Sequence, residues 1–313
     1  MLPAFTYFWW IFNLNAMTRS IRVKLLLACC LAAISVLSYA QERRLELPFV
    51  KPSEKVIAHY AYQLLYNEAA EQASWVAYTL CSENLSGKSE RTNRFMEDPM
   101  VITGSATSAD YEASGFDRGH LCPAADMAWN EVAMRESFYY SNMSPQLPSF
   151  NRGVWKRLEE QVRTWGRQYG KIYVVVGPVL EKGLPTIGAN KVAIPRYYYK
   201  VILRYGDTDA QAIGFIMPNE KSQQPLNTFA VAVDSVEKVT GIDFFCALPD
   251  SVEKRVEATL DHESWSWESV AAKPQKAVEL QGKQCKAITG KGTRCSRKSN
   301  DGTGYCYQHG SQK

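Results

Sequence analysis

One stretch of the chain, from Phe116 to Asp126, concentrates side chains that can do chemistry. It reads FDRGHLCPAAD and places an imidazole, a guanidinium and two carboxylates close together. The imidazole of His120 can act as a base near neutral pH, and the planar guanidinium of Arg118 is suited to holding a phosphate. These residue types indicate acid–base chemistry on a substrate that carries phosphate.

Hydrolysis of a phosphodiester needs a base to activate water, a cation to stabilise negative charge and usually a divalent metal. Asn151 can supply a hard oxygen ligand to Mg²⁺, an ion that keeps most of its waters and needs few protein groups. Glu159 can hold metal-bound waters through hydrogen bonds. Together with His120, these residues form a candidate site for metal-assisted hydrolysis.

A helix over residues 151–169 is predicted to position the amide and the carboxylate. Asn151 falls at the start of this helix, where an asparagine can also serve only as a cap. Glu159 lies about two turns further on, roughly 12 Å along the axis. Apolar side chains recur at three- and four-residue steps and predict one face toward the core: Val154, Trp155, Leu158, Val162, Trp165 and Tyr169.

The remaining elements predict the class of fold. Runs of β-branched and aromatic residues indicate strands at 59–66, 73–80, 171–176, 197–205 and 212–217. Helical patterns occur at 129–139, 233–239 and 250–260. Strands and helices do not alternate regularly, as they would in a doubly wound sheet. We therefore expect an α+β fold with a largely antiparallel sheet and flanking helices.

Three motifs in order give the chain a resemblance to a known family. They are DRGH at 117–120, SFYYSNMSPQ at 137–146 and NRGVWKRLE at 151–159. Together they resemble the DNA/RNA non-specific endonuclease family, which has a ββα-metal active site. The resemblance spans roughly residues 60–260. It implies a metal-dependent, sugar-non-specific endonuclease that hydrolyses phosphodiester bonds in DNA and RNA.

The resemblance also assigns roles to single residues. It implies that His120 is the general base, that Asn151 binds Mg²⁺ directly and that Glu159 reaches the metal through water. It places Arg118 near the phosphate and Asn142 where it supports the base and the substrate. Mn²⁺ can replace Mg²⁺ at an oxygen-rich site, so the identity of the metal stays open.

The family also has an upstream arginine that aids the transition state. Arg91 and Arg94 are both candidates for this role, and their spacing to neighbouring residues does not decide between them. The two carboxylates of the first motif are expected to be structural. Asp117 is predicted to orient Arg118, and Asp126 to terminate a turn.

Cys122 departs from the family pattern, because a small apolar residue is more usual at this position of the motif. A packing role is the favoured interpretation. The alternative is a disulfide with Cys81 or Cys246, which an oxidising compartment would permit.

The first 40 residues are interpreted as an extension followed by a signal peptide. A basic segment from Met17 to Lys24 precedes an apolar run at 25–37 and a small-x-small cleavage site ending at Ala40. We expect a secreted or periplasmic protein. The run is short for a membrane span of about 20 residues, so no stable membrane insertion is expected after processing. Lipidation at Cys29 is an alternative.

The C-terminal tail differs from the rest of the chain in charge. Residues 1–40 carry a net charge of +3 and residues 273–313 carry +7, which leaves residues 41–272 at −6. A basic tail can hold nucleic acid near an acidic domain. The second functional hypothesis is therefore a nucleic-acid-binding or adhesion module, with the tail as its main binding element.

Four side chains in the tail match a structural Cys3His zinc site: Cys285, Cys295, Cys306 and His309. About 25 residues cannot bury a core without such a staple. Disulfides are the alternative, and they would leave one cysteine over.

These observations divide the chain into five parts: an extension with signal peptide at 1–40, a linker at 41–55, the endonuclease domain at 56–262, a linker at 263–280 and a basic Cys3His module at 281–313. The expected partners are DNA and RNA, and the resemblance allows a homodimer.

Overall fold

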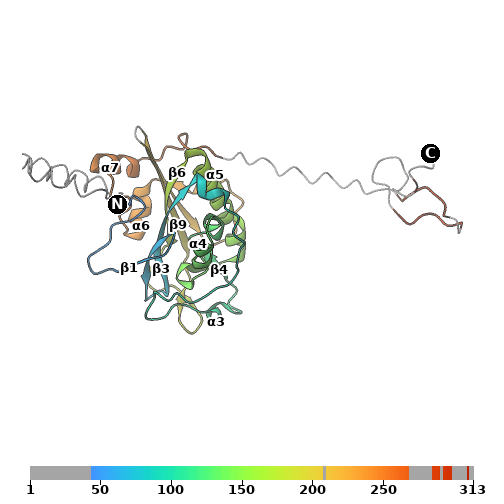
Figure 1. Cartoon of the computed structure of the whole chain (residues 1–313), viewed down its shortest axis with the longest axis horizontal. Coiled ribbons are helices and arrows are strands. Elements are labelled where there is room, and N and C mark those ends of the chain that lie inside the picture. The colour runs from blue at the N-terminus through green and yellow to red at the C-terminus, as the bar shows by residue number, and fades with distance from the viewer. Residues whose placement is uncertain (1–43, 207–208, 268–283, 290–291, 298–308, 310–313) are drawn as a thin grey trace, which may run out of the picture. The chain divides into compact units, whose positions relative to one another are not determined.

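The computed structural model describes residues 44–206, 209–267, 284–289, 292–297 and 309 (Figure 1). These residues divide into two compact units. The first unit comprises the described residues up to 222 together with 229–261, and it contains the sheet. The second comprises 223–228 and the described residues from 262 onward.

The first unit is built around a β-sheet whose strands differ in length. Within the described residues it has seven strands, in the order β1–β2–β3–β6–β9–β10–β11. Every neighbouring pair in it is antiparallel. The strands are β1 Val56–Ala58, β2 Gln63–Asn67, β3 Gln72–Cys81, β6 Lys171–Pro178, β9 Tyr197–Tyr205, β10 Ala210–Pro218 and β11 Ala230–Val231. The prediction of an α+β fold with a largely antiparallel sheet is confirmed.

The central strands follow the apolar runs of the sequence. β6 and β9 are buried along most of their length, since helices cover both faces of the sheet there. The first predicted strand, 59–66, is shorter than expected. Its first residues form the turn between β1 and β2, in which the backbone N–H of His59 donates to the carbonyl of Tyr62 at 2.9 Å.

Helices cover the two faces of the sheet (Figure 1). On one face, α6 Val233–Thr240 and α7 Asp250–Ala258 pack against β10. On the other face lies α5 Lys156–Tyr169, whose Trp165 ring stands 6.2 Å from that of Phe215 on β10. Most of the apolar stripe predicted for this helix is buried: Leu158, Val162 and Trp165 are all 0% exposed, whereas Tyr169 at its end is half-buried.

Shorter elements carry the motifs on the α5 side of the sheet. β4 Asp117–His120 and β5 Met143–Gln146 form a separate antiparallel ribbon. The other elements are η1 Ser82–Ser86, α3 Ser108–Tyr111, η2 Ala124–Met127, α4 Glu131–Glu136, η3 Tyr140–Asn142, η4 Phe150–Trp155, β7 Thr186–Ile187, β8 Val192–Ala193 and η5 Leu226–Phe229. The ribbon is tied to the sheet by Ser144, whose hydroxyl lies 2.6 Å from that of Tyr198 on β9.

The helix predicted over 151–169 is not continuous. A wide π-helical turn, η4, precedes α5, and Gly153 within it has φ −108° and ψ −112°, which are not helical values. Asn151 therefore lies on the wide turn and Glu159 on the regular helix. The spacing expected for one straight helix does not apply to them. Such π turns are frequent at functional sites.

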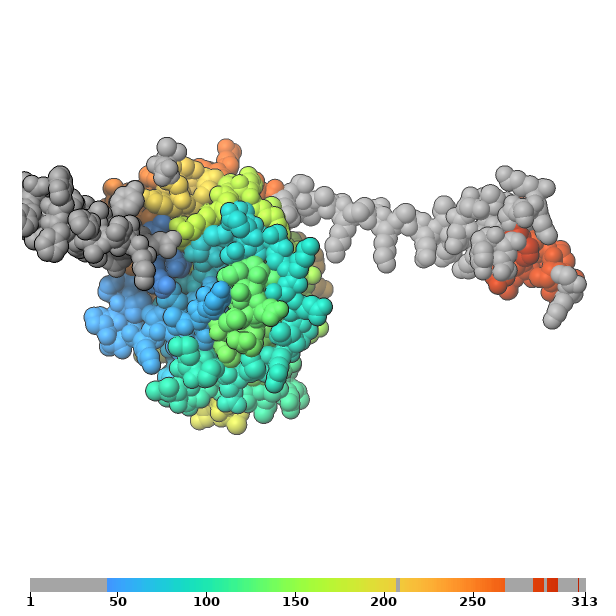
Figure 2. Space-filling model, in the orientation of Figure 1, coloured from blue at the N-terminus to red at the C-terminus, as the bar shows by residue number. Residues whose placement is uncertain are grey.

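The predicted linker at 41–55 is partly folded. Leu45 is 4% exposed and belongs to the core, and the backbone N–H of Phe49 donates to the carbonyl of Asp243 at 2.8 Å. Figure 2 shows this blue segment against the surface of the first unit. The folded domain therefore begins before Val56, because residues near 45 bury apolar surface.

A buried carboxyl group on α7 makes stability depend on pH. Glu257 is 6% exposed, and one of its oxygens has no hydrogen-bond partner among the described residues. Burial, aided by the charges of Glu237 and Glu253, raises the pKa of Glu257 to about 9. The unfolded chain releases this proton near pH 4.3. The free energy of unfolding contributed by Glu257 therefore falls as pH rises from about 4.3 to 9.

Glu257→Gln is expected to remove this dependence and to stabilise the protein at pH 8 by on the order of 1–3 kcal/mol, because the folded chain no longer has to hold a proton that the unfolded chain releases. Thermal unfolding followed by circular dichroism at pH 5.5 and pH 8 measures it. Glu160→Gln, at an exposed position of α5, is the control. Equal pH dependence in the wild type and Glu257→Gln would contradict the prediction.

Candidate active site

The two strands that carry the first motifs lie in close contact. In the β4–β5 ribbon, Gly119 is opposite Ser144 and His120 is opposite Met143. A Cβ atom on Gly119 would lie 2.2 Å from the side chain of Gln146, which is fully buried. Only glycine fits there. The absence of a side chain lets β4 lie against Gln146 and fixes the strand that ends in the histidine.

His120 sits among aromatic rings. Its ring meets that of Phe138 edge-on at 4.8 Å between centroids and that of Phe95 at 5.8 Å. His120 is 8% exposed, and its Nε2 atom has no hydrogen-bond partner among the described residues. Burial, assisted by the charge of Arg91, lowers the pKa of His120 to about 3. The imidazole is therefore neutral at working pH and has a nitrogen that can accept a proton.

Asn142 fixes the backbone directly after the histidine. Its amide oxygen accepts from the N–H of Cys122 at 2.8 Å, and its Nδ2 donates to the carbonyls of Cys122 and Ser137 at 2.9 and 2.8 Å. The side chain is fully buried. It holds the backbone two residues after His120, and its amide bonds to protein carbonyls and an N–H.

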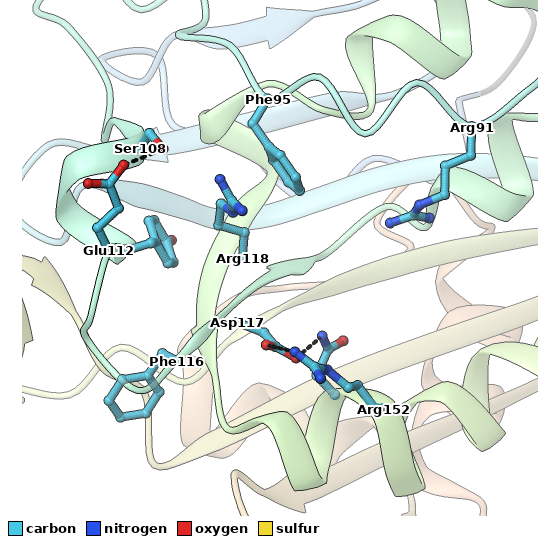
Figure 3. A pocket seen from close by; sticks show the side chains of 10 residues that line it. Arg91, Phe95, Ser108, Glu112, Phe116, Asp117, Arg118 and Arg152 are labelled. Atoms are coloured by element: carbon cyan, nitrogen blue, oxygen red, sulfur yellow. Dashed lines mark hydrogen bonds and ion pairs between the residues drawn. The ribbon is translucent and has the colours of Figure 1, made fainter.

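Asp117 connects the two halves of the site. Its carboxylate accepts from Nδ2 of Asn151 at 2.9 Å and from Nε and Nη2 of Arg152 at 2.8 and 2.6 Å (Figure 3). Arg118 lies instead over the ring of Phe95, with Cζ 4.2 Å from its centroid. The prediction that Asp117 orients Arg118 is therefore wrong. The carboxylate orients Asn151, a contact between residues 34 positions apart.

An open cavity of about 450 Å³ lies between these elements (Figure 3). Several guanidinium groups face it, which suits a polyanionic ligand. Its lining residues are Arg91, Phe95, Ser108, Tyr111, Glu112, Phe116, Asp117, Arg118, Asn151 and Arg152. Neither His120 nor Glu159 is among them. His120 is packed behind the rings of Phe95 and Phe138.

The structure distinguishes the two upstream arginines by position. Arg91 lines the cavity and holds its Cζ 5.0 Å from the centroid of the Phe138 ring, the ring that packs on His120. Its charge lowers the pKa of His120 and opposes the rise in the pKa of Glu159. Arg94 is exposed and does not line the cavity. The geometry therefore favours Arg91 as the upstream arginine.

Glu159 lies in the first turn of α5 and is half-buried. Burial raises the pKa of Glu159 to about 7. The positive charges of Lys200, Arg163 and Arg91 oppose this rise, and the negative charge of Asp126 adds to it. The carboxyl group is thus poised between its two protonation states near neutral pH.

Three of the groups around Glu159 were not predicted from the sequence. Lys200, on β9, is fully buried, with Nζ 4.9 Å from the centroid of the Trp155 ring and no hydrogen-bond partner among the described residues. Arg163 Nη1 donates to Asp126 Oδ1 at 2.8 Å, and the hydroxyl of Tyr78 donates to Asp126 Oδ2 at 2.9 Å. Asp126 is therefore a buried ion-pair partner and does more than terminate a turn.

The sequence contains features that could have predicted Lys200 and Arg163 as neighbours of Glu159. Lys200 interrupts the apolar run YYYKVIL, where a charge is unexpected in a buried strand. Arg163 follows Glu159 by one helical turn, so both side chains share a face of the helix. The partner of Arg163, in contrast, comes from η2 and could not be read from local spacing.

Cys122 has a packing role. Its thiol is fully buried and forms no disulfide in the described part of the chain. Burial raises the pKa of Cys122 well above its ordinary value, so the thiol stays protonated. The favoured interpretation from sequence agrees with this geometry.

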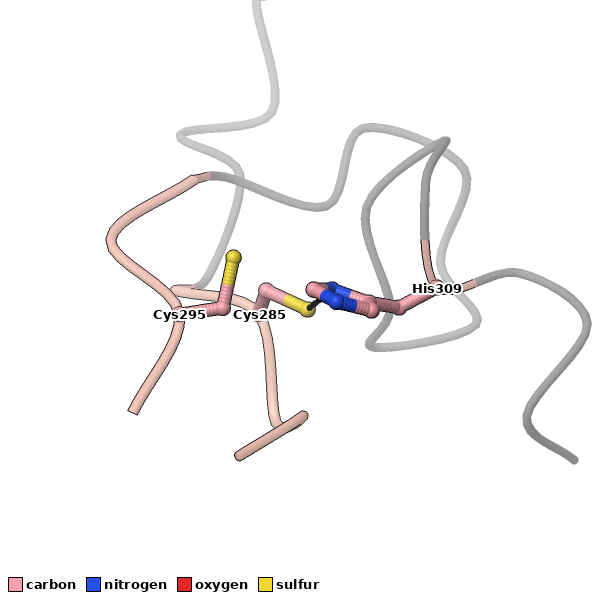
Figure 4. Close-up of side chains that lie close together, drawn as sticks. All are labelled: Cys285, Cys295 and His309. Carbon is pink, nitrogen blue, oxygen red and sulfur yellow. Dashed lines mark hydrogen bonds between the residues drawn. The ribbon is translucent and has the colours of Figure 1, made fainter. Parts of the chain in front are cut away.

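In the second unit, the tail brings together three of its four predicted ligands. The ligand atoms of Cys285, Cys295 and His309 all lie within 4.8 Å of one another (Figure 4). Cys306, the fourth, lies outside the described residues.

Known proteins with similar sequences show which family the chain belongs to. Residues 46–251 match the sequence pattern of the family described as DNA/RNA non-specific endonuclease. Endonuclease G of Homo sapiens is 37% identical over 202 residues, which cover 59% of this chain and 67% of the relative. Nuclease C1 of Cunninghamella echinulata is 38% identical over 205 residues, covering 59% and 80%. The protein is thus a nuclease.

A solved structure agrees with the sequence matches. The chain is similar to a protein chain in the crystal structure of the EndoG/EndoGI complex, a structure described as showing the mechanism of EndoG inhibition. The TM-score is 0.62 and the sequence identity is 31%. The match covers 68% of this chain and 94% of that chain. The chain belongs to the DNA/RNA non-specific endonuclease family.

The prediction of a secreted or periplasmic location is wrong. Endonuclease G and several further relatives that match the chain are named as mitochondrial proteins, not as secreted ones. The residues interpreted as a signal peptide, 17–40, and the alternative lipidation site at Cys29 lie outside the described residues. Among the helices that the structure describes, none is long and apolar enough to cross a membrane.

Arg91→Ala is expected to lower the rate of plasmid cleavage on the order of 100-fold, the usual cost of removing one donor that stabilises developing negative charge. Arg94→Ala, three residues away and outside the cavity, is the matched control and should retain cleavage. Initial rates on supercoiled plasmid measure both variants. Equal losses in the two, or a greater loss in Arg94→Ala, would reverse the assignment.

Proposed function

We propose that the protein is a sugar-non-specific, Mg²⁺-dependent endonuclease that hydrolyses phosphodiester bonds in DNA and RNA. The observation that carries the proposal is the bond from Asn151 to Asp117. It links a candidate metal ligand to the strand that ends in a neutral histidine. The cavity lined by Asn151 and by Asp117 and Arg118 of this strand carries guanidinium groups, which supports a nucleic-acid substrate.

The residues fit a hard divalent cation. With Nδ2 of Asn151 donating to Asp117, the amide oxygen is directed elsewhere and is the donor type that Mg²⁺ prefers. Glu159 supplies a carboxylate for metal-bound waters, and Mn²⁺ is an alternative at these oxygen ligands. A bound cation stabilises negative charge on the phosphate and on the leaving oxygen.

His120 is proposed to act as the general base. The imidazole is neutral and its Nε2 atom lacks a partner among the described residues, so in the tautomer with the proton on Nδ1 it can take a proton from the attacking water. Leaving such an atom unsatisfied costs about 1–3 kcal/mol, which supports a role in chemistry. The rings of Phe95 and Phe138 hold the imidazole in position, and Asn142 fixes the chain after it.

Arg118 and Arg91 are proposed to bind the phosphate oxygens, because both line the cavity and guanidinium groups make strong bonds to phosphate. The named residues address phosphate and metal rather than base edges, which accounts for cleavage without sequence preference. The binding or adhesion alternative needs none of these residues, and a homodimer stays a prediction.

His120→Ala is expected to abolish cleavage of duplex DNA and of RNA because proton transfer is lost, while the fold and substrate binding are largely retained; some loss of thermal stability is expected from the lost contacts with Phe95 and Phe138. Cleavage on gels and binding to a short duplex in Ca²⁺ are the measurements. His262→Ala, at an exposed histidine, is the control. Turnover at the wild-type rate in excess Mg²⁺ would remove His120 from its role.

Asn151→Ala is expected to raise the Mg²⁺ concentration needed for half-maximal cleavage at least about 10-fold, the lower end of the loss seen when support of a metal site is removed. Titration of Mg²⁺ at saturating substrate measures it. Asn227→Ala, at an exposed asparagine on η5, is the control. An unchanged titration would contradict the ligand assignment.

Cleavage is expected to fall as pH drops below about 7, because Glu159 has a raised pKa and takes up a proton there, after which it accepts fewer hydrogen bonds from metal-bound water. His120, with a pKa of about 3, does not cause this fall. Rates between pH 5 and 9 test it. In Glu159→Gln the step near pH 7 should be absent and the rate low throughout; an unchanged step would exclude Glu159 as its cause.

A further inference from the structure

We propose that Cys285, Cys295 and His309 hold a structural Zn²⁺ that staples a β-hairpin in the C-terminal tail. These three residues belong to the second unit, and the zinc site has no part in the proposed nuclease reaction. The sequence predicts Cys306 as a fourth ligand, and this residue lies outside the described part of the chain.

The backbone places the two cysteines on the two arms of a hairpin, offset from each other by two positions. The N–H of Cys295 donates to the carbonyl of Ala287 at 2.8 Å, and the N–H of Cys285 donates to the carbonyl of Arg297 at 2.7 Å. Ile288 and Arg294 pair in antiparallel register. The two thiols therefore come from adjacent strands, the arrangement found when a hairpin presents two ligands to one metal.

The turn of the hairpin is specified by its sequence. The N–H of Gly292 donates to the carbonyl of Thr289 at 2.9 Å, and Thr289 in turn donates to Thr293 at 2.8 Å. Gly292 has φ +75°, a conformation that glycine adopts without strain. The guanidinium of Arg294 donates to the carbonyls of Cys285 and Gln284 at 3.1 and 3.2 Å. These contacts preorganise the first two ligands.

The distances fit tetrahedral zinc. Zinc bonds of about 2.3 Å to sulfur and 2.0–2.1 Å to nitrogen imply a sulfur–nitrogen edge of roughly 3.6 Å. The Sγ of Cys285 lies 3.6 Å from Nδ1 of His309 (Figure 4). All three ligand atoms lie within 4.8 Å of one another. A sulfur–imidazole hydrogen bond would give the same distance for that pair alone.

Burial in the tail also points to a metal. Cys285 is 0% exposed and Cys295 is 3% exposed, and they form a small cluster in which Ala287 is the only other member among the described residues. Ile288 is 60% exposed. Such a cluster offers little apolar area, so burial of the two sulfurs needs another source of stability. Thiolate and imidazole ligands are the set that zinc prefers over Mg²⁺.

The test uses the full chain, purified with a mild reductant and dialysed into metal-free buffer. Zinc is measured by plasma mass spectrometry, and about one ion per chain is expected. Cys295→Ser and His309→Ala should lose most of this zinc. Cys246→Ser removes an exposed cysteine of the first unit and should keep it. Plasmid cleavage and thermal unfolding of the first unit report whether each variant is folded.

Replacement of zinc by Co²⁺ identifies the ligands. The wild type should show the visible bands of tetrahedral cobalt together with a thiolate charge-transfer band, and Cys295→Ser should weaken the latter. His309→Cys should retain cobalt and strengthen that band. Less than about one-tenth of a zinc ion per chain, with Cys285 recovered in a disulfide by peptide mapping, would overturn the proposal. Equal zinc in the wild type and Cys295→Ser would overturn it as well.

Discussion

The site depends on one hydrogen bond, from the Asn151 amide to the Asp117 carboxylate. It joins η4 to β4, two elements that no regular secondary structure connects. β4 is in turn fixed by its pairing with β5 and by the contact of Gly119 with Gln146. Catalytic groups must be held to a fraction of an ångström, and this carboxylate fixes the proposed metal ligand, Asn151, to the strand that carries the proposed base, His120.

Burial acts on the two titratable groups in opposite ways. It disfavours charge, so it keeps His120 neutral, as its proposed role as a base requires, and it pushes Glu159 toward the neutral form, which works against its proposed role of holding metal-bound water. The charge of Arg91 corrects this, because it lowers the pKa of His120 and opposes the rise in the pKa of Glu159. One guanidinium at the cavity thus favours the neutral form of His120 and the ionised form of Glu159.

The sequence predicted most where the signal is local. The run from Tyr197 to Tyr205 forms β9 with the expected bounds, and most of the apolar stripe of α5 is buried. The prediction failed at Gly153, because a wide turn and a regular helix share the same apolar spacing. The partner of Asp117 could not be predicted either, since it is chosen by the packing of β4 against η4 and not by neighbours in the chain.

Lys200 lowers the stability of the fold while it places a positive charge near the site. A buried ammonium next to Trp155 is costly, and a leucine or methionine in the middle of β9 would stabilise the sheet at least as well. The cation is useful because the carboxylates of half-buried Glu159 and buried Asp126 lie near enough to interact with it. Selection for thermal stability alone would remove these charges together. The middle of the sheet is therefore a place where folding and activity make opposing demands on the same residues.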